Sequence, residues 1–206
     1  AGSIAVGLGY TMQTTVAANG LFYRALWPVQ DQRLAAVRNL LIAIVGSLLL
    51  WASAKVHIPF YPVPLTMQTY MVLVIGAVCG WRLGGATVLL YLAEGAMGLP
   101  VFSGTPERGI GIAYMAGPTG GYLLGFLLSA LLIGWLAERG WDRSLWRMLV
   151  AMTLGHVLIL ALGAGYLATL LGGAAAWANG VEPFLWATVL KTALAGATLP
   201  AAWALL

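Results

Sequence analysis

Residues 65–99 read LTMQTYMVLVIGAVCGWRLGGATVLLYLAEGAMGL, an apolar run with Arg82 near its middle and Glu94 toward its end. A membrane-spanning helix needs about 20 mostly apolar residues, and fewer in a compact protein. The run therefore predicts two short spans, Leu65–Trp81 and Leu83–Leu99. Only Arg82 separates them, so we expect the chain to reverse there in a tight turn.

The rest of the chain has the same character. Of its 206 residues, 61% are hydrophobic and only 8% are charged, with a mean hydropathy of +0.91. Soluble domains are roughly 25% charged, so most of this surface must face lipid. The 10 Lys and Arg residues form no basic stripe, which argues against nucleic-acid binding. Soluble enzymes, nucleic-acid binders and secreted scaffolds are therefore excluded.

Six spans predict an all-α membrane protein, a compact bundle of six transmembrane helices over residues 34–206. They are Leu34–Ser53, Leu65–Trp81, Leu83–Leu99, Gly120–Ala137, Leu145–Leu171 and Phe184–Leu205. An even number places both termini on one side. That side has seven basic residues, Arg24, Arg33, Arg38, Arg82, Arg139, Arg143 and Arg147, and the other has at most three, Lys55, Arg108 and Lys191. Basic residues favour the cytoplasmic side, so we expect both termini in the cytoplasm.

Residues 1–33 are expected to form an N-terminal tail. Residues 1–11 are rich in glycine and begin without Met, so we treat them as a candidate leader from protein expression. Residues 17–27 fit either an amphipathic helix on the cytoplasmic membrane surface or a frayed tail.

Ionisable groups inside a bilayer are costly and are functional candidates by default. Glu94, His156 and Lys191 lie within or near the outer ends of spans, and Arg108 lies in a long outer loop. These positions predict a ligand site near the extracellular face. Two structural alternatives stay open: a buried ion pair between Glu94 and Lys191, and a helix-packing role for His156.

Two outer loops are predicted to form walls or a lid of this site. Residues 56–66 carry Pro59, Pro62 and Pro64, which prevent helix and favour extended backbone. Residues 100–122 are rich in Gly and Pro and end in GPTGGY. The chain has no phosphate-binding GK motif, zinc-protease HExxH motif or GxSxG nucleophile turn. Its single Cys79 and few carboxylates indicate no metal site, and we expect no cofactor.

Three motifs closely resemble the BioY family. They are IPFYPVPLTMQT at residues 58–69, RLGG at 82–85 followed by LYLAEGAMGLPVF at 90–102, and GPTGGYLLGF at 117–126. The resemblance covers about residues 34–206. BioY proteins are the biotin-binding S components of energy-coupling factor (ECF) vitamin transporters. It therefore implies a multi-pass protein of the bacterial cytoplasmic (inner) membrane that takes up biotin, and no enzyme.

The family also implies the ligand contacts. Arg108 matches a loop arginine of the family, and Lys191 matches the lysine of an Asp-x-x-Lys pair whose aspartate is Thr188 here. Because Thr188 brings no charge, we expect Glu94 to accept the ureido N–H groups, and Arg108 or Lys191 to bind the carboxylate. The predicted ligand-binding residues are Gln68, Tyr91, Glu94, Arg108, Tyr122, His156, Thr188 and Lys191.

The resemblance supplies the partners too: an ECF transmembrane coupling subunit and two ATPases, although some members are thought to act alone or as homo-oligomers. Ala43 and Ser47 form a small-xxx-small pair that predicts a surface for close helix approach. The alternatives are an S component or secondary carrier for another small heterocyclic acid, a membrane-embedded hydrolase or transferase using Glu94 and His156, and a helix-packing subunit without a ligand.

Overall fold

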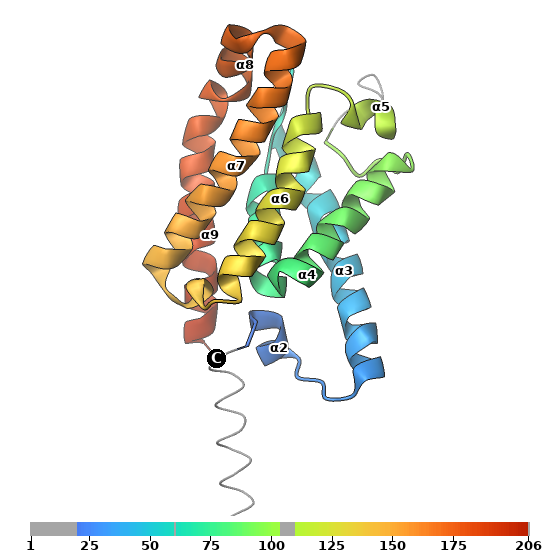
Figure 1. Ribbon diagram of the computed structural model, residues 1–206, viewed down its shortest axis with the longest axis vertical. Helices are drawn as coiled ribbons and strands as arrows, with labels where there is room; N and C mark the ends of the chain where they lie inside the picture. Colours follow the sequence, from blue (N-terminus) through green and yellow to red (C-terminus); the bar gives the residue numbers. More distant parts are fainter. Residues whose placement is uncertain (1–19, 60, 104–109, 206) are drawn as a thin grey trace, which may run out of the picture.

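The computed structural model describes residues 20–59, 61–103 and 110–205, and it is almost entirely helical (Figure 1). The elements are α2 (Phe22–Leu26), α3 (Gln32–Lys55), β1 (His57–Ile58), β2 (Leu65–Thr66), α4 (Gln68–Ala96), α5 (Ile112–Met115), α6 (Gly120–Ala137), η2 (Trp141–Arg143), α7 (Leu145–Leu171), α8 (Gly173–Gly180), η3 (Glu182–Phe184) and α9 (Leu185–Ala204). This confirms the all-α prediction. The predicted spans at 120–137 and 145–171 coincide with α6 and α7.

Five helical segments of the described chain are long and apolar enough to cross a membrane, with α4 counted once and α8 joined to α9. However, α4 is broken at Gly80, where φ is 75° and ψ is 175°. A Cβ placed on Gly84 would lie 3.0 Å from the Cα of Gly76. Residues eight apart approach this closely only when the chain doubles back. The two arms of α4 are therefore the second and third predicted spans, which gives six crossings.

The position of the reversal differs from the prediction at Arg82. The chain turns at Gly80 because the turn needs a positive φ, which glycine adopts without steric cost. Arg82 instead lies in the second arm, where its guanidinium stacks 5.0 Å from the Trp81 ring centroid.

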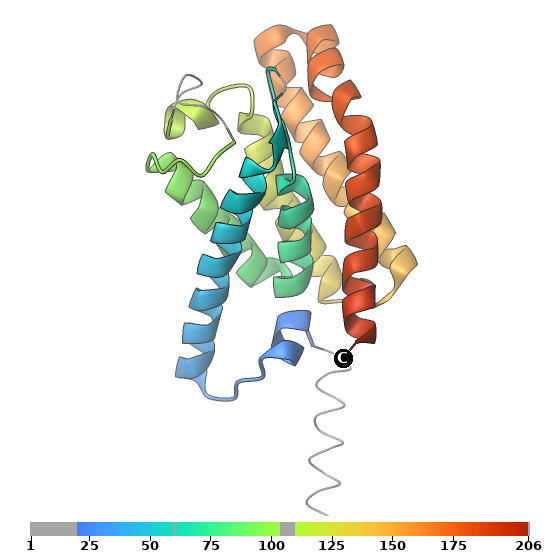
Figure 2. The same ribbon diagram turned by 180° about the vertical axis from the view of Figure 1, so that it is seen from behind.

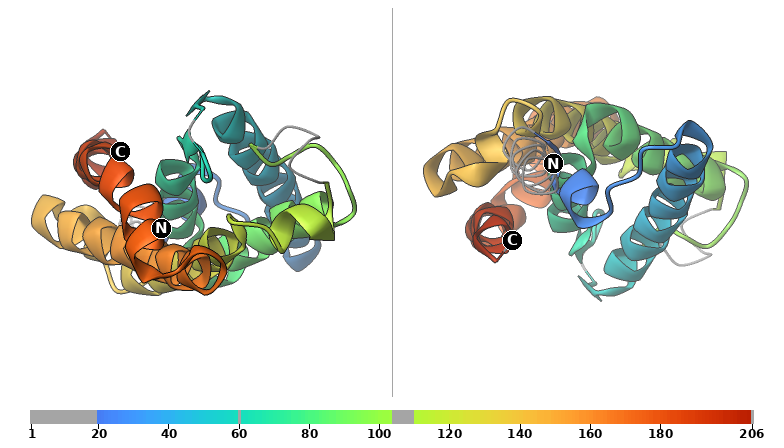
Figure 3. Two further views of the ribbon diagram at one scale, coloured as in Figure 1. Left: turned by 90° about the horizontal axis from the view of Figure 1, so that it is seen from above. Right: turned by 90° about the horizontal axis from the view of Figure 1, so that it is seen from below.

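The second arm of α4, α6 and α7 form the centre of the bundle, while α3 and α9 stand at its two sides with the first arm of α4 between them (Figure 2). The views along the long axis show the helices in a curved layer, with α3 set apart at one edge (Figure 3). Leu73, Val88 and Ile133 are buried in the core. The side of α3 that faces away from α4 is lined by exposed apolar residues, as expected for contact with lipid.

Both described ends of the chain lie at the same end of the bundle (Figure 1). There α2 packs beneath the bundle, and the Phe22 and Trp203 rings lie 5.1 Å apart. The indole nitrogen of Trp203 donates to Asp142 Oδ2 at 2.7 Å. Burial raises the pKa of the Asp142 carboxyl, and this hydrogen bond counteracts the effect. These contacts join α2 and α9 to η2, which closes the end of the bundle opposite the β-hairpin.

A substitution on α6 tests the tight contact with the α4 reversal. A Cβ on Gly134 would lie 2.3 Å from the backbone nitrogen of Trp81, and backbone atoms cannot move aside cheaply. We expect Gly134→Ala to destabilise the protein by about 1–3 kcal/mol and lower its melting temperature in detergent. Gly165→Ala is the matched control, since a Cβ there meets nothing within 4 Å. Equal melting temperatures for the two variants would contradict this close packing of α6 against α4.

Candidate ligand-binding site

A pocket opens at the end of the bundle opposite the described chain termini, between the β-hairpin, α4, α6, α7 and α9. Its empty volume is about 590 Å³, part of it open to solvent. More than half of its lining side chains are apolar or aromatic and the rest are polar, which is typical of a small-molecule site. Val63, Pro64 and Thr66 of the hairpin region line it, as the proline-rich sequence predicts. The hairpin pairs His57 with Thr66 and Ile58 with Leu65 in antiparallel register.

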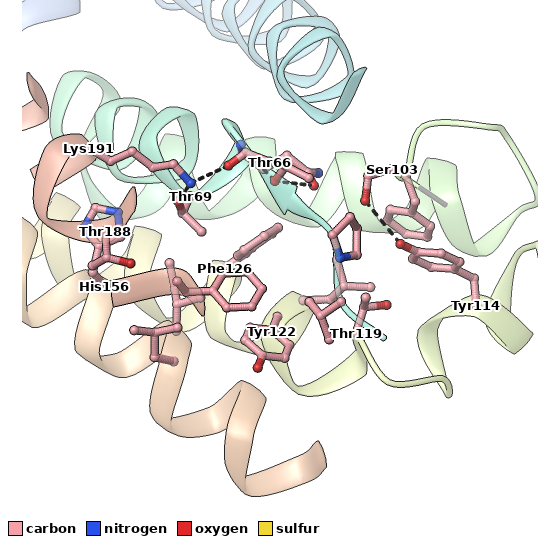
Figure 4. A pocket seen from close by; sticks show the side chains of 18 residues that line it. Thr66, Thr69, Ser103, Tyr114, Thr119, Tyr122, Phe126, His156, Thr188 and Lys191 are labelled. Carbon is pink, nitrogen blue, oxygen red and sulfur yellow. Dashed lines mark hydrogen bonds between the residues drawn. The ribbon is translucent and has the colours of Figure 1, made fainter. Parts of the chain in front are cut away.

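The middle of the pocket is aromatic. Tyr122 and Phe126 of α6 lie along one side between the two ends (Figure 4). The ring of Tyr122 stacks on Phe184 at a centroid distance of 6.1 Å, and its hydroxyl donates to the carbonyl of Gly180 at 2.7 Å. That hydrogen bond turns the polar atom of Tyr122 away toward α8, so the ring offers its apolar surface to the pocket.

One end of the pocket is polar and holds its only described cation, Lys191. The ammonium group donates to the Thr66 carbonyl at 2.5 Å and to the Thr69 hydroxyl at 3.3 Å. His156 and Thr188 lie beside it (Figure 4). Three segments distant in sequence therefore meet here: the end of the hairpin with the start of α4, then α7, and α9.

The other end is also polar but carries hydroxyl groups. Ser103, Tyr114 and Thr119 line it (Figure 4), and the Ser103 and Tyr114 hydroxyls lie 3.4 Å apart. The ring of Tyr114 stacks on Phe102 at 4.9 Å. These residues come from the Gly- and Pro-rich loop between α4 and α6, in agreement with the prediction that this loop forms a wall.

Residues 100–102 of that wall are held by hydrogen bonds to their carbonyl groups. Lys55, the last residue of α3, donates to Pro100 at 2.9 Å and to Phe102 at 3.0 Å. The Tyr91 hydroxyl donates to Val101 at 2.9 Å and accepts from the Gln68 amide at 2.6 Å. Helices α3 and α4 thus position the Phe102 ring in the pocket.

The structure brings five of the predicted ligand-binding residues to the pocket wall: Gln68, Tyr122, His156, Thr188 and Lys191. Tyr91 is fully buried behind the wall, where it supports Gln68. Arg108 lies outside the described residues. Sequence reasoning did not single out Thr66, Thr69 or Phe126, although all three fall within the quoted motifs.

Glu94 is placed elsewhere, at the interface between α3 and α4. Its carboxylate accepts a hydrogen bond from the Ser47 hydroxyl, and it is not among the residues that line the pocket. Lys191 uses its ammonium on Thr66 and Thr69, so the alternative of an ion pair between Lys191 and Glu94 is not observed among these contacts. Ser47 and Ala43 are themselves buried within the chain, so neither lies on the surface where a partner interface was predicted.

Within the described ranges, no group of three or more His, Cys, Asp and Glu side chains is placed to hold a metal ion. Fold and pocket together define a multi-helix membrane protein with a small-molecule site at one end. The model of the BioY family matches residues 26–206. This chain belongs to the BioY family.

Relatives and a solved structure agree with this assignment. The biotin transporter BioY of Thermotoga maritima is 37% identical over 160 residues, covering 77% of this chain and 92% of the relative. The probable biotin transporter BioY of Pyrococcus horikoshii is 36% identical over 142 residues, covering 69% and 82%. The crystal structure of the S-component for biotin from an ECF-type ABC transporter has the same fold, with a TM-score of 0.71 at 21% identity over 84% of this chain and 94% of that one. The family and these relatives confirm the prediction of a transport protein and not an enzyme.

The role of the Lys55 hydrogen bonds in holding residues 100–102 can be tested without a ligand. We expect Lys55→Met to speed amide hydrogen exchange in this segment roughly 5-fold, because it removes two hydrogen bonds from an exposed lysine worth about 1 kcal/mol together. Lys55→Arg keeps the donors and should retain the wild-type exchange rate. Unchanged exchange in Lys55→Met would show that the lysine does not hold the wall.

Proposed function

We propose that this chain binds biotin in the pocket and mediates its uptake as an S component. The observation that carries the proposal is the pocket's division into two polar ends with an aromatic middle (Figure 4). Biotin has polar and apolar groups in the same order along its length: a polar ureido ring, an apolar sulfur-containing ring and chain, and a terminal carboxylate. The names of the relatives support the same ligand.

The proposed orientation has the pocket open to the outside of the bacterial cytoplasmic membrane. Arg24 lies in α2, Arg38 and Arg143 donate to the Trp27 and Gly20 carbonyls on either side of α2, and Arg139 follows the end of α6. Helix α2 and the C-terminal end of α9 meet at this end of the bundle (Figure 1), and positive charge favours the cytoplasmic side. The pocket lies at the opposite end, where it can capture a ligand from the external medium.

The sequence has no phosphate-binding GK motif, so ATP hydrolysis that drives concentrative uptake would take place in partner subunits. We propose an ECF transmembrane coupling subunit and two ATPases as these partners, with action alone or as a homo-oligomer as the alternative. Co-purification of the tagged chain with ATPase subunits from its native host, and its loss on removal of the coupling subunit, would support the module.

The carboxylate contact is assigned to one of two bases, Lys191 in the pocket or Arg108 of the outer loop. Binding of biotin and of biotin amide separates them. A base that binds the carboxylate discriminates strongly between these two ligands, and its removal abolishes that discrimination. A base that binds the other end of the ligand affects both equally.

A pair of substitutions tests the site. Lys191→Met should weaken biotin binding roughly 10–100-fold, because hydrogen bonds from a charged group contribute about 1.5–3 kcal/mol. Glu94→Gln should change the dissociation constant less than about 3-fold, because Glu94 lies outside the pocket and glutamine can still accept from Ser47. Calorimetry on protein stripped of co-purified ligand measures both. The reverse order of effects would restore Glu94 as the ureido contact.

Comparator ligands test the identity of the substrate. We expect one-to-one binding of biotin that is tighter than that of lipoate, with desthiobiotin between them. If folded, stripped protein binds no biotin, the ligand is another small heterocyclic acid. Mass spectrometry of the ligand released on stripping would then identify it.

A further inference from the structure

One nitrogen atom in the pocket wall has no hydrogen-bond partner among the described residues, Nε2 of His156. The side chain is only 1% exposed, and it lines the pocket from α7 beside Thr188 and Lys191 (Figure 4). A buried polar atom without a partner costs free energy. Its position in a ligand pocket indicates that the partner is supplied by the ligand.

The other ring nitrogen determines what that partner must be. Nδ1 lies 3.0 Å from the Met152 carbonyl oxygen, one turn earlier in α7, and 2.9 Å from the Thr192 hydroxyl. A carbonyl oxygen only accepts hydrogen bonds, so the Nδ1 proton points to Met152, and the Thr192 oxygen lies close enough to share it. In the neutral imidazole, Nε2 then carries a lone pair and is an acceptor.

Two of the neighbouring polar side chains at this end are already partly engaged, and the Thr188 hydroxyl beside them can donate or accept. The Gln68 amide donates to Tyr91 and accepts from Thr66. Lys191 uses two of its three N–H bonds on Thr66 and Thr69. Beside that hydroxyl, one lysine donor and the His156 acceptor therefore remain for a ligand.

A carboxylate cannot satisfy both groups, because it has no proton to donate to Nε2. A cyclic urea can, since it has a carbonyl oxygen next to N–H groups. Resting on the proposed function, we propose that His156 Nε2 accepts a hydrogen bond from a ureido N–H of biotin, while Lys191 donates to the ureido oxygen. The carboxylate then lies toward the Ser103 and Thr119 end, and the acceptor role expected of Glu94 belongs to His156.

The test compares the wild type with His156→Leu in the binding of biotin and of biotin methylated on one ureido nitrogen. The comparison is made with each of the two N-methyl isomers. His156→Leu should weaken biotin binding about 10–100-fold. One isomer should bind the wild type much more weakly than biotin does, and His156→Leu should reduce that penalty at least 5-fold. His156→Gln, which places an amide oxygen near Nε2, should recover part of the affinity. Leu154→Ala is the control on the same helix, because Leu154 is exposed and outside the pocket lining, and it should leave the methylation penalty unchanged.

The outcomes separate the two proposals. If the wild type binds no biotin, the proposed function fails. If the wild type binds biotin but the methylation penalty is the same in His156→Leu, the ureido assignment is overturned while the function stands. Equal affinities of wild type and His156→Leu for biotin overturn it as well.

A measurement on the wild type guards against variants that do not fold. The chain has two histidines, His57 and His156, so ¹⁵N-histidine labelling yields few signals, and His57 lies outside the pocket lining as an internal reference. We expect the Nε2 signal of His156 to be that of an unprotonated nitrogen and to shift when biotin is added. A protonated Nε2, or a signal that biotin leaves unchanged, would refute the assignment.

Discussion

The close contact of Gly134 with the backbone at Gly80 and Trp81 is the constraint on which the site depends. It lets α6 lie directly against the reversal of α4, so that the two arms of α4 run side by side. At the far ends of those arms, the Gln68 amide nitrogen then lies 2.6 Å from the Tyr91 hydroxyl oxygen. Since Tyr91 also holds Val101, packing at one face of the membrane determines the position of a pocket wall at the other.

Polar groups in a membrane protein must find partners within the protein, because lipid offers none. Thr87 and Ser129 do so with backbone carbonyls at 2.8 and 2.9 Å, which are purely structural solutions. The pocket differs because Nε2 of His156 in its wall has no hydrogen-bond partner within the described residues. A ligand can supply the hydrogen-bond partner that such a pocket lacks. The aromatic residues in the middle of the pocket offer apolar contact area that needs no hydrogen bond.

Much of the fold was predictable because composition changes sharply at span ends, as at Gly120–Ala137 and Leu145–Leu171. The reversal was misplaced by two residues because a charge at Arg82 is conspicuous, whereas the need for a positive φ at Gly80 depends on three-dimensional packing. For the site, the sequence indicated Lys191, Thr188 and His156 correctly as residues of one pocket. It could not indicate Thr69 or Lys55, because their roles arise from contacts between segments far apart in the chain.

Glu94 and Lys191 show why an ionisable residue in a membrane span is only a starting hypothesis for function. Both lie in apolar helices, and sequence spacing reveals the helix face of each but not the neighbour that it meets. Glu94 meets Ser47 of α3 and is engaged between two helices of its own chain. Lys191 contacts the hairpin, and one of its three N–H bonds is not used on Thr66 or Thr69. What distinguishes a structural group from a ligand-binding one is therefore where its remaining hydrogen-bonding capacity points.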